Sequence, residues 1–106
     1  RMVAGERAEQ ALIKNLALLG LEDDIVHKRM SEISGGQRQR IILAAIALLD
    51  KDLWLLDEPT SALDCASRNL VLYFLRIQQQ EGRTIVAVTH DKEFAEKCSR
   101  VINLDT

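Results

Sequence analysis

The sequence predicts an α/β fold built on a parallel β-sheet, and three observations indicate it. Two apolar stretches, 53–56 and 84–89, have the composition of buried strands. A long segment between them, 65–81, has the periodicity of a helix. The order strand, helix, strand favours parallel pairing through a right-handed crossover. With 106 residues, the chain has the size of one ordinary domain or of part of one.

The first third of the chain is predicted to be helical. Residues 6–19 place their apolar side chains on one helical face, and Gly20 is predicted to stop this helix. The acids at 22–24 are typical of the start of a second, shorter helix, because the positive end of the helix dipole favours them. His27 has no partner at the spacing of metal ligands, so we expect it on the surface.

A glycine pair precedes the next predicted helix, 37–49, whose second half is apolar enough to predict burial. Ser34 is a suitable N-cap for it. Gly35 and Gly36 would let an outside group approach the backbone N–H groups closely. A helix N-terminus is partly positive, so an anion such as phosphate fits there. A tight, capped loop without a ligand is the alternative interpretation.

The stretch 53–56 predicts a strand buried on both faces, with Trp54 in the core. It runs directly into two adjacent acids, Asp57 and Glu58. Neighbouring carboxylates repel each other and must be offset by a cation, a proton or hydrogen-bond donors. The pattern indicates a functional site, and a solvated turn that carries two acids is the alternative.

After this strand, Asp64 is predicted to cap the helix 65–81, whose end at 78–81 we expect to be solvated. A short helix at 92–98 and a last strand at 100–104 complete the expected elements. The apolar face of the long helix is predicted to carry Leu70, Phe74 and Ile77.

The spacing of the polar residues suggests where a ligand binds. In open parallel sheets, ligands bind beyond the carboxyl ends of the strands. Asp57 and Glu58 follow the first predicted strand, and His90 follows the second, 84–89. The three side chains are therefore expected to lie at the same edge of the sheet.

Four motifs in this order resemble those of ABC-type ATPases. Residues 33–40 (Ile-Ser-Gly-Gly-Gln-Arg-Gln-Arg) are similar to the signature motif, and 53–58 resembles a Walker B strand. Residues 61–64 (Ser-Ala-Leu-Asp) resemble the D-loop, and His90 resembles the switch histidine. The resemblance extends from about residue 30 to 91. Ile33 is the one departure within the motifs, where leucine is commoner.

The resemblance implies a role for each site residue in binding and hydrolysing ATP. Asp57 would hold Mg²⁺ through its water shell. Glu58 would polarise the attacking water as general base, and His90 would contact the γ-phosphate. The active unit would be a head-to-tail dimer of two nucleotide-binding domains, in which the signature of one covers the nucleotide of the other. The nucleotide-binding residues so implied are Ser34, Gly35, Gly36, Gln37 and Asp64.

No phosphate-binding P-loop is present in the sequence. That loop needs a Gly-x-x-x-x-Gly-Lys-Ser/Thr pattern, and none of the 5 glycines has another glycine five places on. The resemblance therefore implies the carboxyl-terminal half of a cassette, as one incomplete domain of P-loop NTPase type. Residues 1–33 would be part of the helical subdomain, and 34–106 would be the signature helix and the carboxyl-terminal part of the ATPase core.

Two expectations follow from an incomplete cassette. The chain alone should bind ATP weakly or not at all and should not hydrolyse it. Its strands should also lack sheet neighbours and expose apolar surface, which favours self-association or strand exchange.

Composition narrows the class of protein. A formal net charge of -2 gives no electrostatic reason to expect nucleic acid as a partner. The longest apolar run, 41–49, is far shorter than the roughly 20 residues that span a bilayer. The first residues lack the apolar core of a secretory signal, so we expect a cytoplasmic chain with Cys65 and Cys98 as free thiols. The resemblance would place it on the inner face of the membrane through a transmembrane partner.

The predicted function is that of the ATP-binding and ATP-hydrolysing subunit of an ABC transporter, whose helical subdomain faces the membrane subunit. One alternative is a non-transport ABC ATPase of the DNA-repair or translation type. The repair type would carry coiled-coil heptads before the signature, whereas residues 1–33 contain one short amphipathic helix. The other alternative is a non-catalytic module that docks a partner, which has no need for Asp57, Glu58 and His90 together.

Overall fold

The computed structural model describes residues 5–97, and these residues form a mixed α/β fold, as predicted. The predicted strand 100–104 and Cys98 lie outside the described residues. The elements, in chain order, are α1 (Glu6–Leu18), the 3₁₀ helices η1 (Asp23–His27) and η2 (Met30–Glu32), α2 (Gly35–Ile46), the 3₁₀ helix η3 (Ala47–Leu49), β1 (Leu53–Asp57), α3 (Cys65–Gln80), β2 (Thr84–Val88) and α4 (Lys92–Glu96).

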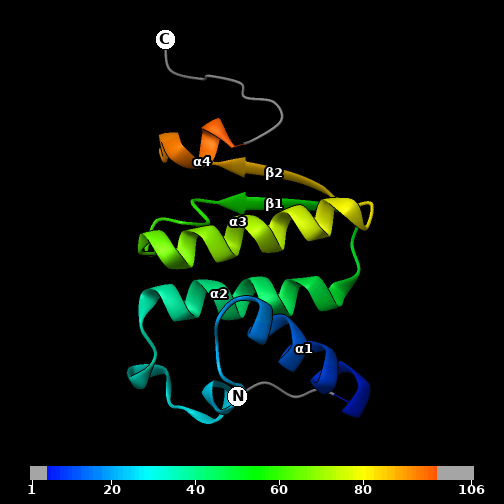
Figure 1. Cartoon of the computed structure of the whole chain (residues 1–106). Helices are drawn as coiled ribbons and strands as arrows, with labels where there is room; N and C mark the ends of the chain where they lie inside the picture. The colour runs from blue at the N-terminus through cyan, green and yellow to red at the C-terminus, as the bar shows by residue number, and fades with distance from the viewer. Residues whose placement is uncertain (1–4, 98–106) are drawn as a thin grey trace.

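The two strands pair in parallel, as predicted. The register runs from Leu53 opposite Thr84 to Asp57 opposite Val88, and α3 is the connection between the strands. Figure 1 shows α3 beside the sheet, α2 running alongside α3, and α1 on the far side of α2. The carboxyl ends of both strands lie at the same end of the molecule as the start of α2 (Figure 1).

One hydrophobic core connects these layers, and it includes Trp54, as predicted. Its side chains come from α1, α2, β1, α3 and α4 and from the segment that follows α1. Phe74, Leu16, Leu19 and Val71 are the largest side chains that are fully buried in it. The buried members are Leu12, Leu16, Leu19, Leu21, Ile25, Leu43, Ala44, Trp54, Leu56, Val71, Phe74, Leu75 and Phe94.

The predictions that 53–56 is buried on both faces and that 84–89 is a second buried strand are wrong. Along β1, burial alternates: Trp54 and Leu56 are buried, whereas Leu53 is 54% exposed and Leu55 is 75% exposed. The alternation arises because successive strand residues point to opposite faces, and the helices cover only one face of this sheet. On β2, Val86 and Val88 are also exposed, so the expected bare apolar surface is present.

The helix boundaries follow from their caps. Gly20, with φ 76°, ends α1 in a left-handed turn in which the Leu21 N–H reaches back to the Leu16 carbonyl. Gly82, with φ 98°, ends α3 in the same way. The predicted second helix near 22–24 is the 3₁₀ helix η1, and His27 within it is exposed, as expected.

Helix α2 begins at Gly35 and ends at Ile46, so its predicted range of 37–49 is wrong at both ends. Its capping residue, Ser34, is the one that the sequence indicated. Only Leu43 and Ala44 are buried in its apolar second half, and Ile42 is half exposed. The apolar run is longer than the face that the neighbouring helices cover.

The buried face of α3 is shifted from the predicted one. Phe74 is buried as expected, but Leu70 is 36% exposed, and Val71 and Leu75 are buried beside Phe74. Gln78, expected in solvent, is buried and accepts a hydrogen bond from Arg83 Nη1 at 2.8 Å. Within residues 5–97, no helix combines the length and the apolar character needed to span a bilayer.

Candidate functional site

Glu58 and His90 lie together beyond the carboxyl ends of the two strands. The Glu58 N–H donates to the Val88 carbonyl at 2.7 Å, which extends the parallel ladder one residue past β1. His90 follows β2 by two residues, so the chain delivers it to the same edge. The convergence of these two side chains, which the spacing predicted, is confirmed.

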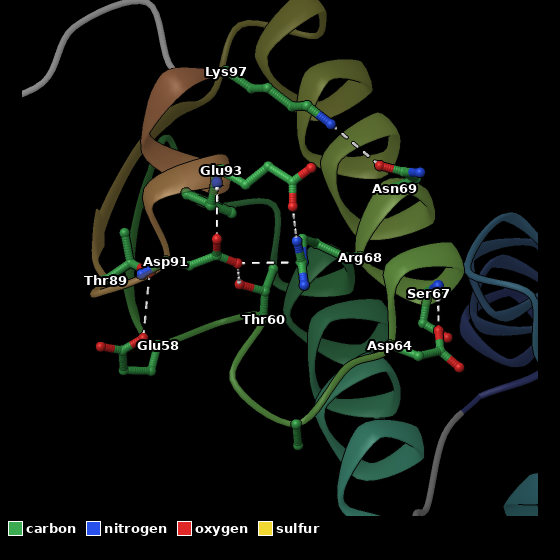
Figure 2. Close-up of polar contacts among 12 residues, drawn as sticks. Glu58, Thr60, Asp64, Ser67, Arg68, Asn69, Thr89, Asp91, Glu93 and Lys97 are labelled. Atoms are coloured by element: carbon green, nitrogen blue, oxygen red, sulfur yellow. Dashed lines mark hydrogen bonds and ion pairs between the residues drawn. The ribbon is translucent and has the colours of Figure 1, made fainter.

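The Glu58 carboxylate is held by the residues that follow β2. Its Oε1 accepts the His90 backbone N–H at 2.9 Å, and its Oε2 accepts the Thr89 hydroxyl at 3.3 Å. The imidazole Nε2 of His90 lies 3.8 Å from Oε1. The Glu58 side chain is 29% exposed and that of His90 is 88% exposed, so both can meet a ligand from solvent. Figure 2 shows Glu58 below Thr89, and Thr89 lies at the turn from β2 to α4.

The backbone of Glu58 is unusual because its φ is 46°. Residues with a Cβ seldom adopt this left-handed conformation, which costs about 1–2 kcal/mol relative to the right-handed region. Asp50, in the turn before β1, is the other non-glycine residue of the described chain with positive φ. At Glu58 the conformation turns the chain out of the strand and presents the carboxylate to residues 89 and 90.

Asp57 is the last residue of β1 and is exposed. It lies opposite Val88 in the register, on the strand face that is open to solvent. Across residues 5–97, no group of three or more His, Cys, Asp or Glu side chains is arranged to hold a metal ion. Any metal at Asp57 would therefore take most of its ligands from elsewhere, such as water or a phosphate.

Ser34 and Gln37 cap α2 reciprocally. The Gln37 N–H donates to Ser34 Oγ at 3.1 Å, and the Ser34 N–H donates to Gln37 Oε1 at 3.0 Å. In this reciprocal arrangement, each side chain acts only as a hydrogen-bond acceptor. The hydroxyl hydrogen of Ser34 and the NH₂ group of Gln37 remain donors at the exposed start of the helix.

Gly36 has a neighbour that sequence reasoning did not foresee. The glycine pair suggested an approach from outside, but Gly36 is buried against the loop that precedes α3. A Cβ at Gly36 would lie 2.8 Å from the Ala62 carbonyl oxygen and 3.2 Å from Leu63 Cδ2. At Gly35, a Cβ would meet only the Ala62 methyl group, at an ordinary 3.5 Å. The need for glycine at position 36 is thus internal to the chain.

Gln39 lies in the motif that resembles the signature, but the sequence analysis gave it no role at the site. Its Nε2 donates to the Glu58 carbonyl at 3.2 Å and to Ser61 Oγ at 3.0 Å. Its Oε1 accepts the Ala62 N–H at 3.3 Å. One signal was present in the sequence, because Gln39 lies three residues after Gly36 and therefore on the same face of α2.

Asp64 is the N-cap of α3, as predicted. Its Oδ1 accepts the Ser67 N–H at 2.8 Å. This backbone hydrogen bond, followed by one from the Ser67 side chain and by the charge of Arg40, holds the pKa of Asp64 below its usual range. The carboxylate is exposed and stays ionised near neutral pH.

Asp91 joins the segment after His90 to two other elements, and the sequence analysis gave it no role. Its Oδ2 accepts the Thr60 hydroxyl at 2.9 Å and lies 3.3 Å from Arg68 Nε on α3. Its Oδ1 accepts the Phe94 N–H and so caps α4. Figure 2 shows this cluster, in which Arg68 also pairs with Glu93.

The charge state of Asp91 follows from opposing effects. Desolvation on burial is the largest single effect and raises its pKa. The hydrogen bonds from Phe94 and Thr60 and the charge of Arg68 together outweigh it, so the pKa of Asp91 lies below its ordinary value. An ionised Asp91 therefore fixes the turn that carries His90.

A family model described as "ABC transporter" matches residues 4–61, which is more than half of the chain of 106 residues. Macrolide export ATP-binding/permease protein MacB of Bartonella henselae is 43% identical over 102 residues, or 96% of this chain. MacB of Pectobacterium atrosepticum is also 43% identical, over 98% of this chain. The chain spans 15% of the length of each of these two curated relatives.

Solved structures agree with the family model. The dimeric structure of MJ0796, a bacterial ABC transporter cassette, is similar with a TM-score of 0.79 and 28% identity. That match covers 92% of this chain and 42% of the cassette. A post-hydrolysis state of MJ0796 bound to ADP and Pi is similar with a TM-score of 0.78. The predicted resemblance is thereby confirmed, and the chain belongs to the ABC transporter family.

Proposed function

We propose that this chain is the carboxyl-terminal part of an ATP-binding cassette that hydrolyses ATP for an ABC transporter. The observation that carries the proposal is the pairing of Glu58 with His90 beyond the ends of two parallel strands. Two relatives named ATP-binding/permease proteins and a solved cassette bound to ADP and Pi support it. We place residues 1–33 in the helical subdomain and 34–106 in the signature helix and ATPase core.

The residues present fit ATP and Mg²⁺ in part. Ser34 and Gln37 keep free donors at the start of α2, as a phosphate oxygen requires. Asp57 offers one exposed carboxylate, which suits Mg²⁺ because this ion keeps several waters and takes few protein ligands. The P-loop pattern is absent from the sequence, so the main phosphate cradle would come from another part of the cassette.

When bound, Mg²⁺ and ATP supply the charge neutralisation and the transferable phosphoryl group. Glu58 acts as general base: it accepts a proton from the attacking water and orients that water in line with the γ-phosphate. His90 donates a hydrogen bond to the γ-phosphate from its exposed imidazole. Thr89 and the His90 N–H hold the carboxylate of Glu58 in place, which reduces the reorganisation needed at the moment of reaction.

The proposed active unit is a head-to-tail dimer with a second nucleotide-binding domain. Ser34, Gly35, Gly36 and Gln37 would cover the γ-phosphate of the nucleotide that the partner holds. Asp64 would lie in the loop that links the two composite sites. A dimeric solved cassette supports this arrangement. The helical subdomain would contact a membrane-spanning subunit, so the assembly would lie on the cytoplasmic face of the membrane.

The test is to supply the missing phosphate cradle. The 106-residue chain is titrated calorimetrically with Mg-ATP, alone and then with an amino-terminal cassette half that carries a P-loop. We expect no heat from the chain alone, and binding with steady hydrolysis after reconstitution. Tight binding by the chain alone would contradict the proposal that it lacks the main phosphate site.

A variant of Glu58 and a matched control variant test whether Glu58 is the general base. Glu58→Gln removes the base but keeps the size of the side chain and one oxygen that can accept the His90 N–H. We expect it to lower kcat by at least about 100-fold, in the range of general acid–base effects, while ATP still binds. Glu96→Gln, an exposed acid on α4, is the control and should hydrolyse ATP at the wild-type rate. Equal rates for the two variants would exclude Glu58 as the base.

The exposed sheet face supports a second proposal, that the 106-residue chain self-associates in isolation. Four apolar side chains line this face, and both outer edges of the two-stranded sheet are unpaired within the described residues. Size-exclusion chromatography with light scattering tests it, and a monodisperse monomer at high concentration would contradict it. The four side chains are Leu53, Leu55, Val86 and Val88.

A further inference from the structure

We propose that Gln39 is a positioning residue that transmits the placement of α2 to the backbone of Glu58. It does so with one side-chain amide that touches Glu58, Ser61 and Ala62. The inference rests on the proposed function, because it assigns a role toward the carboxylate that would activate water. Gln39 itself does not touch the reacting atoms.

The three contacts require an amide of this length. The Nε2 group donates one hydrogen to the Glu58 carbonyl at 3.2 Å and another to Ser61 Oγ at 3.0 Å. The Oε1 atom accepts the Ala62 N–H at 3.3 Å. Glutamate offers the acceptor but no donor, asparagine is shorter by one methylene, and leucine has neither group. Among similar side chains, only glutamine makes all three bonds.

The hydrogen bonds of Gln39 to the loop before α3 are reinforced by a second contact beside them, the packing of Gly36. Gly36 and Gln39 are three residues apart on α2 and face the same loop. Gly36 packs so closely on the Ala62 carbonyl that no side-chain atom fits between them. The start of α2 therefore moves together with residues 61 and 62. Through Gln39 it also moves together with the carbonyl of Glu58.

Glu58 needs this support because its backbone is held at φ 46°. Such conformations persist only where the surroundings fix them. The Glu58 N–H is fixed by the Val88 carbonyl, and its carboxylate by residues 89 and 90. The one remaining polar group, the carbonyl oxygen, accepts hydrogen bonds from Gln39 Nε2 at 3.2 Å and from the Ser61 N–H at 3.3 Å. Without Gln39, this carbonyl keeps only the Ser61 N–H, which belongs to the same turn. The turn then loses its hydrogen bond to α2 at this carbonyl and can shift the carboxylate relative to the attacking water.

The structural half of the proposal is tested on the 106-residue chain by NMR, with no nucleotide present. In Gln39→Leu, we expect the exchange protection of the Ala62 amide to fall at least about 10-fold and the Glu58 carbonyl ¹³C shift to move. Gln39→Glu keeps the acceptor for Ala62, so it should retain that protection and still change the Glu58 carbonyl. Gln79→Leu, on an exposed position of α3, is the control and should alter neither signal.

The functional half is tested in the reconstituted cassette. Gln39→Leu should lower kcat about 10- to 100-fold with the KM for ATP within twofold of wild type, because displacing a catalytic group by about 1 Å has such an effect. Gln39→Asn should recover little of the lost rate, because it cannot span the distance.

The outcomes separate this inference from the proposed function. If wild type hydrolyses ATP and Gln39→Leu matches it in kcat, the positioning role is refuted while the function stands. Unchanged Ala62 and Glu58 signals in Gln39→Leu would refute the role at the structural level. If wild-type cassette fails to hydrolyse ATP, the proposed function itself is refuted, and this inference falls with it. A raised KM at unchanged kcat would mean that Gln39 serves nucleotide binding and would also overturn the proposal.

Discussion

Replacing Gly36 by alanine tests how closely the signature helix lies against the loop before α3. The added Cβ would stand 2.8 Å from the Ala62 carbonyl oxygen, which is backbone and cannot swing away. It would also stand 3.2 Å from Leu63 Cδ2. The helix or the loop must therefore move by several tenths of an ångström. We expect Gly36→Ala to lower the free energy of unfolding.

The expected change in the free energy of unfolding combines two opposing effects. Alanine in place of glycine favours a helix by up to about 1 kcal/mol. Extra volume in a closely packed contact costs about 1–3 kcal/mol. Gly35→Ala shares the first effect but lacks the second, since its Cβ would meet the Ala62 methyl at 3.5 Å. The difference between the two variants isolates the steric cost, so Gly36→Ala should be less stable than Gly35→Ala by about 1–3 kcal/mol.

Urea unfolding followed by the fluorescence of the buried Trp54 measures this difference directly. Both variants should have the same m-value, so the midpoints can be compared. We expect Gly35→Ala to match or exceed wild type and Gly36→Ala to unfold at lower urea. If the two variants unfold at the same midpoint, the loop does not press on Gly36, and the argument that joins α2 to Glu58 loses one of its two contacts.

Three further predictions concern the stability of the core, the loss of stability at low pH and self-association through the exposed sheet face. Phe74→Ala should lower the free energy of unfolding by about 3–5 kcal/mol because the ring is fully buried, whereas Tyr73→Ala on the exposed side should change it by less than about 0.5 kcal/mol in the same urea assay. The lowered pKa of Asp91 means that its contribution to stability is fully present above the unfolded-state pKa and is lost as pH falls through the folded-state pKa, below about pH 4. Asp91→Asn should remove this part of the acid dependence of the thermal midpoint, and an unchanged pH profile would contradict the assignment. Leu55→Lys should leave the midpoint nearly unchanged, since the side chain is 75% exposed, but should reduce self-association in light scattering.

Local sequence signals predicted the elements whose causes are local. Ser34 and Asp64 were identified as caps because a short polar side chain precedes each helix, and both accept the expected backbone N–H. Gly20 and Gly82 stop their helices for an equally local reason. The convergence of Glu58 with residues after β2 was also predictable, since parallel strands present their carboxyl ends at one edge.

Features that depend on contacts distant in sequence were missed. The apolar run 53–56 has the composition of a strand buried on both sides, but burial depends on what covers each face, and one face here is open. Gln39 contacts Glu58 and Ala62, which lie 19 and 23 residues away in sequence. Its place on the same helix face as Gly36 does not identify these partners.

The left-handed backbone of Glu58 has a consequence for anyone who redesigns this segment. Glycine or asparagine accepts such a φ with less conformational cost, so an optimisation for stability alone is drawn to replace this residue. The replacement would delete the carboxylate in the proposed active site. At this position the demands of folding and of chemistry are opposed, and a thermostable version of the cassette should be sought by changing other residues.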